Sequence, residues 1–494
     1  MNLRIILLSL LISIASLGYA QKDIADNDIS EAIENEISYD PAINLNNINI
    51  TVNQGIVELT GQVSNILTKD RAANIAEMVK GVSTVSNRIE VTPKKTLKDS
   101  DIRSNIMASL LENPTTESYE VNVDVKQNHV TLTGTVDSYR EKRLCSTVAK
   151  SVPGVKSLEN NIEVTYDIVR RDAEIENDIS QALKWSKLVD DALIEVEVED
   201  GVVNLDGSVA TVSDKNHAHF LALTSGVKRV NMEDLDIEWW VPNDELVRGK
   251  SEYASETDVE NAIADAAFMD PRLESFDLMI DYEDGVVTLR GKVDNLEAKQ
   301  AAKNIAMNTM AVKRVNNRIK VDTEFPPDDE KIRKNILEAL ARNSITESYE
   351  IVVSVSAGIV NLTGFVDSYL EKMTASAVAG KVDGITTVKN NLTVDEELSY
   401  YWWEGIPFYT WYYVPDINAR VIAGSMIDDD QIKEDVKNEL WWSPYVDSKD
   451  IQVEVDNGEV TLTGTASTLR EYNRATQNAY EGGAWDVDND ILIK

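Results

Sequence analysis

The chain has 494 residues, a formal net charge of −37 and one cysteine, Cys145. So acidic a chain repels nucleic acid and anionic lipid at long range, and we expect no nucleic-acid partner. The hydrophobic fraction is 43%, which argues against a disordered acidic tail. A single cysteine cannot form an internal disulfide, so ordinary hydrophobic cores must stabilise the folded parts, and Cys145 is expected to be a buried thiol.

Residues 1–20 have the pattern of a secretory signal peptide. Arg4 precedes an apolar run from Ile5 to Leu17, and small residues lead to a cleavage site after Ala20. The run is too short for a membrane-spanning helix. These residues predict an exported, periplasmic product.

A strand–turn–strand pattern follows and occurs six times along the chain. In the clearest copy, Gly358 to Val366, apolar residues alternate as in a half-buried strand, and an earlier alternating run pairs with it. The leading glycine suits a tight hairpin turn. The second glycine interrupts the strand, which favours a bulge or a close backbone approach over a phosphate-binding loop. The predicted structural glycines are Gly55, Gly61, Gly134, Gly201, Gly207, Gly285, Gly291, Gly358, Gly364, Gly458 and Gly464.

Each hairpin lies between two predicted helices. The upstream helix carries an apolar i,i+4 pair, such as Ile102 and Ile106, and the downstream helix leads through a turn glycine into a third strand. Ala311 replaces that turn glycine in the fourth copy, so the end of its helix is expected to be altered. The predicted fold is α+β, with six tandem αββαβ domains, each a three-stranded sheet with two helices.

The repeats predict the following domain boundaries. A signal peptide (1–20) is followed by domains at 24–93, 98–166 and 172–240, a linker at 241–255, domains at 256–323 and 327–396, an aromatic-rich insertion at 397–426, and a domain at 427–494. The second and fifth copies share Thr-Glu-Ser-Tyr-Glu, at Thr116 and at Thr346. Such pairs indicate a three-domain block that has been duplicated once.

The insertion before the sixth domain is unusually aromatic. Its rings could pack over neighbouring domains, burying apolar area, or form a surface for a partner or a membrane interface. Both interpretations stay open. The candidate interaction residues are Tyr400, Tyr401, Trp402, Trp403, Phe408, Tyr409, Trp411, Tyr412 and Tyr413.

The repeated hairpin and the later Gly-Val-x-x-Val-x-Asn-x-Ile strand, seen from Gly81 to Ile89, resemble the BON domain family. All six copies match. The resemblance implies a small αββαβ fold, an exported envelope location and association with phospholipid or membranes. It also implies a link to osmotic stress and to chaperoning of exported proteins, while one cytoplasmic relative senses potassium.

No catalytic, cofactor or metal site is predicted. His217 and His219 are two residues apart on a helix, whereas helical metal pairs prefer four, so we expect solvated side chains. No nucleophile motif appears, and we expect no enzyme. The leading hypothesis is a binding scaffold of the bacterial envelope for envelope proteins or unfolded clients. The alternative is membrane-surface association through the domains and the aromatic insertion.

Overall fold

The computed structural model describes most of residues 24–493. The residues within that span that it does not describe are 39–42, 44, 114, 117–119, 167–169, 190, 239–254, 274, 324–325, 347–350, 367–368, 395–428, 444–445, 457–458, 467–468, 483 and 485. The six repeats are called units 1 to 6.

The elements of the six units follow one order. Unit 1 contains α2 (Asp26–Ser38), η1 (Leu45–Asn47), β1 (Ile48–Asn53), β2 (Ile56–Val63), α3 (Ile66–Met78), β3 (Thr84–Asn87) and β4 (Glu90–Val91). Unit 2 contains α4 (Asp99–Glu112), β5 (Glu120–Lys126), β6 (His129–Val136), α5 (Tyr139–Lys150) and β7 (Ser157–Val164). Unit 3 contains α6 (Asp172–Trp185), β8 (Ile194–Glu199), β9 (Val202–Val209), α7 (Val212–Ala222), β10 (Arg229–Asn231) and β11 (Leu235–Ile237).

The second half repeats this order. Unit 4 contains α9 (Glu256–Phe268), β12 (Met279–Glu283), β13 (Val286–Arg290), β14 (Lys292–Val293), α10 (Leu296–Met307), β15 (Arg314–Asn317) and β16 (Lys320–Val321). Unit 5 contains α11 (Asp329–Ala341), β17 (Ile351–Ser356), β18 (Ile359–Val366), α12 (Tyr369–Gly380) and β19 (Thr387–Val394). Unit 6 contains α14 (Asp429–Trp442), η2 (Ser448–Asp450), β20 (Ile451–Asp456), β21 (Glu459–Ala466), α15 (Leu469–Glu481) and β22 (Asp486–Ile493).

The hairpin strands and the third strand form one small sheet in each unit except unit 4, where β14 and β16 form a separate two-stranded sheet. The second strand is central, antiparallel to the first and parallel to the third, as in β17-β18-β19. The third strand is continuous in units 2, 5 and 6 and interrupted in units 1, 3 and 4. The predicted αββαβ fold is confirmed.

The cores come from the predicted alternation. Ile102 and Ile106 of α4 are fully buried against the inner face of the sheet, where Leu132 of the central strand is fully buried too. Each unit uses the equivalent residues, so every sheet has one face on its helices and one face free of them.

An aspartate at the start of the first helix fixes the hairpin turn. The Asp26 carboxylate accepts hydrogen bonds from the backbone N–H groups of Gln54 and Gly55, at 2.9 and 3.0 Å. Asp99 does the same in unit 2, where Asn128 adopts positive φ in place of the missing glycine. Asparagine tolerates this conformation better than most residues, which explains why that copy of the pattern lacks its leading glycine.

The second glycine of the hairpin meets the backbone just before the first strand. Gly61 has φ +124°, and a Cβ there would lie 2.0 Å from the Asn47 carbonyl oxygen. Ala311 has φ +68° at the turn where units 2 and 5 have glycine. The preceding helix α10 ends at the same place as α5 and with the same backbone capping bonds, so the altered helix ending expected for unit 4 is wrong. The alanine instead takes up the glycine-like backbone conformation at some cost in strain.

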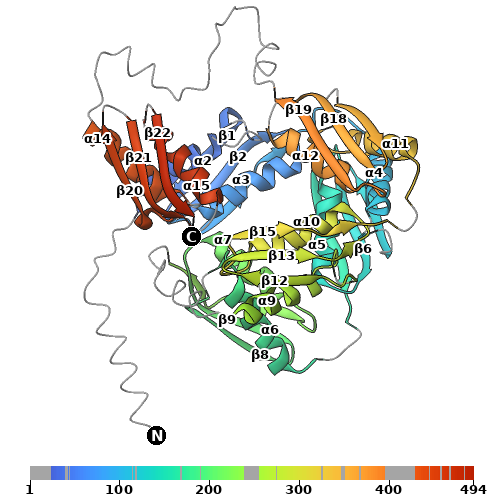
Figure 1. The fold of residues 1–494 in the computed structure, drawn as a ribbon, viewed down its shortest axis with the longest axis horizontal. Helices are drawn as coiled ribbons and strands as arrows, with labels where there is room; N and C mark the ends of the chain where they lie inside the picture. Colours follow the sequence, from blue (N-terminus) through green and yellow to red (C-terminus); the bar gives the residue numbers. More distant parts are fainter. Residues whose placement is uncertain are drawn as a thin grey trace, which may run out of the picture.

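The units pack against one another rather than forming an extended string. Figure 1 shows unit 6, in red, beside the blue elements of unit 1, and unit 5, in orange, near the cyan elements of unit 2. The buried residues of units 1 and 2 form one continuous cluster.

Candidate functional site

The outer face of the unit 5 sheet exposes apolar side chains. Alternation along β17 and β18 buries Val353 and Leu362 and turns Val352, Ile359 and Phe365 outward. These three are 62%, 39% and 57% exposed. Large apolar side chains exposed together on one sheet face are candidates for a binding surface.

The neighbours of these residues on the face are almost uncharged. Register places Val352 opposite Thr363, Ile359 opposite Thr387, and Phe365 opposite Thr393. The described outward side chains are Val352, Ser354, Ser356, Ile359, Asn361, Thr363, Phe365, Thr387, Lys389, Asn391 and Thr393, with Lys389 as the single charge. We call these residues the unit 5 face. Little charge must be dehydrated when a partner covers it.

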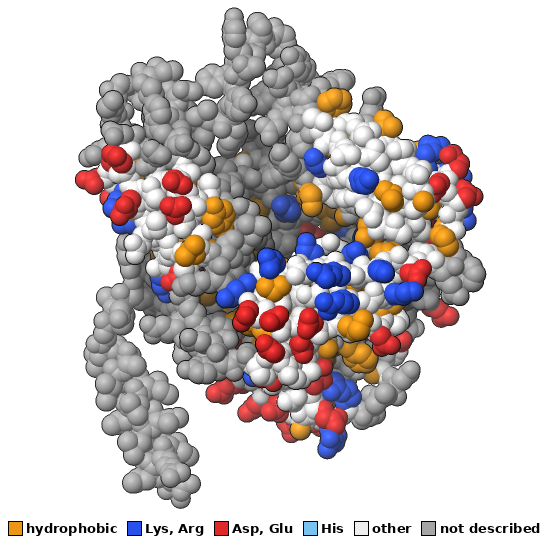
Figure 2. Space-filling model, viewed as in Figure 1, with side chains coloured by type: hydrophobic (Ala, Val, Ile, Leu, Met, Phe, Trp, Pro, Cys, Tyr) orange, Lys and Arg blue, Asp and Glu red, His pale blue; other side chains and the backbone are white. Residues whose placement is uncertain are grey.

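The equivalent faces of the other units carry more charge. The described charged outward residues are Glu120, Asp124, Lys126, Glu159 and Glu163 in unit 2; Glu195, Glu197, Glu199, Asp206, Arg229 and Asp236 in unit 3; and Glu454, Asp456, Asp488 and Asp490 in unit 6. Unit 4 exposes several cations on β13 to β16, and unit 1 carries an Arg88–Glu58 ion pair of 2.8 Å. In Figure 2 the surface over β18 and β19 is mostly uncharged, with scattered hydrophobic side chains.

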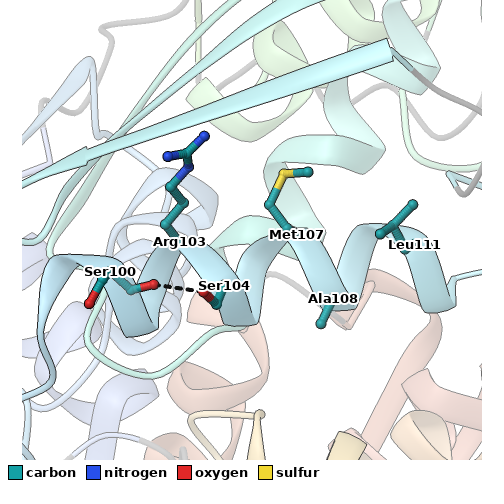
Figure 3. Close-up of a pocket in the computed structure, with 6 residues that line it drawn as sticks. All are labelled: Ser100, Arg103, Ser104, Met107, Ala108 and Leu111. Atoms are coloured by element: carbon teal, nitrogen blue, oxygen red, sulfur yellow. Dashed lines mark hydrogen bonds between the residues drawn. The ribbon is translucent and has the colours of Figure 1, made fainter.

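A second low-charge surface lies along α4 of unit 2. A groove there is lined by Ser100, Arg103, Ser104, Met107, Ala108 and Leu111, whose side chains Figure 3 shows along the helix. The Ser104 hydroxyl donates to the Ser100 carbonyl at 2.9 Å, and Leu111 is 59% exposed. We call these six residues the α4 groove. The equivalent positions on α11 include Glu330, Lys334 and Glu338, so α11 presents charges instead.

The cysteine and the three histidines do not converge on one site. Cys145 is buried, and burial raises the pKa of its thiol to about 12, which makes it unreactive. His217 and His219 are half-buried rather than solvated, and burial lowers the pKa of each ring. His129 is exposed and contacts Ser157. Within the described ranges, no group of three or more His, Cys, Asp or Glu residues could hold a metal ion.

The sequence-predicted site residues lie apart from these surfaces or outside the described part. Ten of the eleven glycines are described and lie in the hairpins of their own units, while Gly458 is not described. The nine aromatic residues from Tyr400 to Tyr413 and the predicted signal peptide also lie outside the described residues.

Sequence reasoning missed Val352, Ile359 and Phe365. A usable signal was present, because the alternate positions of β17, β18 and β19 lack the charges that the other copies carry there.

Among the described helices, none combines the length and the apolar character needed to cross a membrane.

Two curated relatives match part of the chain. Osmotically-inducible protein Y of Escherichia coli is 33% identical over 122 residues, which cover 24% of this chain and 61% of that protein. The outer membrane lipoprotein DolP of Haemophilus influenzae is 28% identical over 140 residues, covering 27% of this chain and 72% of the relative. The match thus spans about three fifths of the first relative's length.

A solved structure of CdsD, a structural protein of the type III secretion system of Chlamydia trachomatis, is 16% identical. The match covers 46% of this chain and 99% of the solved chain, with a TM-score of 0.12, too low to support an argument. The family model described as BON domain matches residues 25–93, 98–166, 171–237, 255–323, 328–396 and 428–494. These six matches cover most of the chain, and the protein belongs to the BON domain family.

Proposed function

We propose that this protein is a non-enzymatic binding scaffold of the bacterial envelope, related to envelope stress, that holds apolar segments of unfolded or partly folded exported proteins on the unit 5 face. The observation that carries the proposal is the exposure of Val352, Ile359 and Phe365 on a sheet face whose described residues carry one charge, in a chain whose net charge is −37. The relative named osmotically-inducible protein Y supports the stress association.

The chemistry of the face suits an unfolded segment. Phe365 offers an aromatic anchor, and the surrounding threonines and asparagines can hydrogen-bond without burying a charge. The acidic surfaces of units 3 and 6 keep the scaffold soluble when the face is occupied. Enzymatic activity has no part in this proposal.

The test exchanges the anchors for residues that the same fold already tolerates. Unit 2 has Asn122, His129 and Thr135 at the equivalent positions, so the variant is Val352→Asn, Ile359→His and Phe365→Thr combined. Its affinity for reduced, carboxymethylated α-lactalbumin, a permanently unfolded probe, is compared with that of the unchanged chain by fluorescence anisotropy. We expect binding to weaken about tenfold or more, as for loss of an interface anchor.

The matched control replaces an exposed apolar residue elsewhere. Leu492 of unit 6 is 67% exposed but lies on a strand with Asp488 and Asp490, and Leu492→Asn should leave the affinity unchanged. Equal weakening by both variants, or no weakening by the unit 5 variant, would show that the unit 5 face is not the binding surface.

The second candidate is association with a phospholipid surface, and the α4 groove favours it. Met107, Ala108 and Leu111 supply an apolar strip, while Arg103 and two serines supply a cation and hydroxyls for a phosphate headgroup. In this candidate function Trp402, Trp403 and Trp411, which lie outside the described residues, would contribute aromatic side chains that suit a membrane interface. The relative named as an outer membrane lipoprotein also points to the envelope membrane.

Vesicle flotation separates the two candidates. Vesicles of phosphatidylethanolamine and phosphatidylglycerol are mixed with the chain at low and at physiological salt. The net negative charge repels these vesicles, so lipid association should be stronger at physiological salt, where the repulsion is screened. Replacing Ser104→Lys, Ala108→Glu and Leu111→Ala gives α4 the residues of α11 and should abolish flotation. Replacing the three tryptophans with serine tests the aromatic contribution. A chain that stays unbound at both salt concentrations rules out this candidate.

A further inference from the structure

The contact between units 2 and 5 joins equivalent positions. Arg342 of α11's C-terminal end forms an ion pair with Glu112 of α4, and the two residues are 230 positions apart, the same spacing that relates Thr116 to Thr346. The Arg342 side chain is 15% exposed. A contact between equivalent residues of two repeats maps onto itself under a two-fold rotation, so the pair is what a pseudo-two-fold axis between units 2 and 5 produces.

Two further contacts are related by the same axis. At the C-terminal end of α6 in unit 3, Trp185 packs against the core of unit 4, and its carbonyl accepts a hydrogen bond of 2.9 Å from the Met310 N–H. At the C-terminal end of α14 in unit 6, Trp442 packs against the joint core of units 1 and 2, and the Trp441 carbonyl accepts a hydrogen bond of 2.7 Å from Lys80 Nζ. Unit 3 therefore contacts unit 4 with the same helix end that unit 6 uses on unit 1.

The contacts within each half are repeated as well. Unit 2 meets unit 1 through a Lys150–Asp70 ion pair of 2.6 Å, and unit 5 meets unit 4 through Lys381–Glu297 at 3.6 Å. Each pair joins the C-terminal end of one second helix to the N-terminal part of another, α5 to α3 and α12 to α10. The duplicated sequence block is thus also a duplicated packing unit.

We propose that units 1–3 and units 4–6 are complementary binding partners, each fitted to the other, and that the chain is a pseudo-dimer joined by its backbone. Among the described residues, contacts cross between the halves at several places, including the axis pair Glu112–Arg342, the Trp185 contact and the Trp442 contact. Beside the last, Arg474 of unit 6 pairs with Glu36 of unit 1 at 2.8 Å, with side chains 12% and 10% exposed. Apolar anchors flanked by enclosed ion pairs are the composition of a specific interface, not of a chance contact between linked domains.

The chain is cleaved only after the intact protein has folded and been purified. A specific protease site is inserted after Asp244, between units 3 and 4, and the purified protein is cleaved and passed over a sizing column at low micromolar concentration. The halves should stay together at the mass of the uncut chain. Halves that separate, whether folded or unfolded, overturn the proposal.

A charge exchange tests the axis. Arg342→Glu would place two glutamates at the axis, and the cleaved halves should then dissociate about tenfold or more readily. Adding Glu112→Arg reverses the pair and should restore most of the affinity, since the two positions are equivalent. If the double variant binds no better than Arg342→Glu alone, the pseudo-two-fold contact is refuted. Leu492→Asn, far from the crossing regions in sequence and on an exposed site, is the control and should leave the cleaved halves together.

Discussion

Units 2 and 5 are built from the same five elements and meet each other at the pseudo-two-fold axis, yet they present different surfaces. Unit 2 has charges on its sheet face and the low-charge groove on α4, whereas unit 5 has charges on α11 and the low-charge face on its sheet. Their inner residues are interchangeable in kind, as with Leu132 and Leu362, both fully buried. The repeat conserves what folds the unit and leaves the outward positions free to acquire binding surfaces.

The largest expected effect tests the shared core. Leu132→Ala and Leu362→Ala each remove a fully buried side chain from the central strand, and each should lower the free energy of unfolding by about 2–5 kcal/mol. Hydrogen exchange of strands β6 and β18 measures the two units separately. If one of the two variants lowers the free energy of unfolding of its own unit while the other variant leaves its unit unchanged, the two cores are not equivalent.

Moving the apolar residues of the unit 5 face onto unit 2 tests whether these residues alone account for the difference between the two faces. Asn122→Val, His129→Ile and Thr135→Phe together give unit 2 the anchors of unit 5. If apolar anchors suffice, this variant should bind a second unfolded probe, though more weakly, because Glu120, Asp124, Glu159 and Glu163 remain around them. A titration measures how many probe molecules bind per chain. If the variant still binds one probe, a binding face also requires the absence of charge.

The contact of unit 6 with unit 1 should depend on pH more than the contact between units 2 and 5. Burial, with Glu36 and Glu31 nearby, raises the pKa of Glu439 to about 7, whereas an unfolded glutamate titrates near 4.5. The folded form therefore binds more protons between these values, and the stability of this contact falls as pH rises through that window. One proton sets a limit of about 1.4 kcal/mol per pH unit, and partial solvation reduces it.

The stability of unit 6 is measured at pH 5 to 8 by monitoring its thermal unfolding with hydrogen exchange. Glu439→Gln should flatten it. A dependence that survives in the glutamine variant would assign the effect to another group.

A smaller effect is expected at the turn before the third strand. Units 2 and 5 have Gly154 and Gly384 there, but unit 4 has Ala311 at φ +68°. Ala311→Gly removes the steric cost of alanine in this conformation and should stabilise unit 4 by about 1 kcal/mol. A lower melting temperature for the glycine variant would show that Ala311 is not strained.

Much of the fold could be predicted from sequence because the cores repeat. The i,i+4 pairs and the hairpin alternation are local patterns, and their recurrence predicts the six units. The 230-residue spacing between matching segments predicts the duplicated block. The packing between units could not be predicted, since it depends on a few long side chains, such as Arg342 and Trp185, that have no local pattern of their own. The half-buried histidines were missed for the same reason, because a neighbouring unit covers α7 through contacts such as that of Arg143 with Phe220.

The candidate surface needed the structure for a different reason. The alternation alone indicates which residues point outward, but it does not show whether another unit covers them. In the structure Val352 and Phe365 remain more than half exposed after the six units have packed. The aromatic insertion was the conspicuous feature of the sequence, and its role remains a proposal to be tested beside the unit 5 face.

The central claim is that the unit 5 face, and not its unit 2 counterpart, contacts unfolded protein. The most direct measurement places a photo-crosslinking amino acid at position 365 in one sample and at the equivalent position 135 in another, and irradiates each with unfolded, carboxymethylated α-lactalbumin. The account predicts strong crosslinking from position 365 and little from position 135. Equal crosslinking from both positions, or crosslinking from 135 alone, would contradict it.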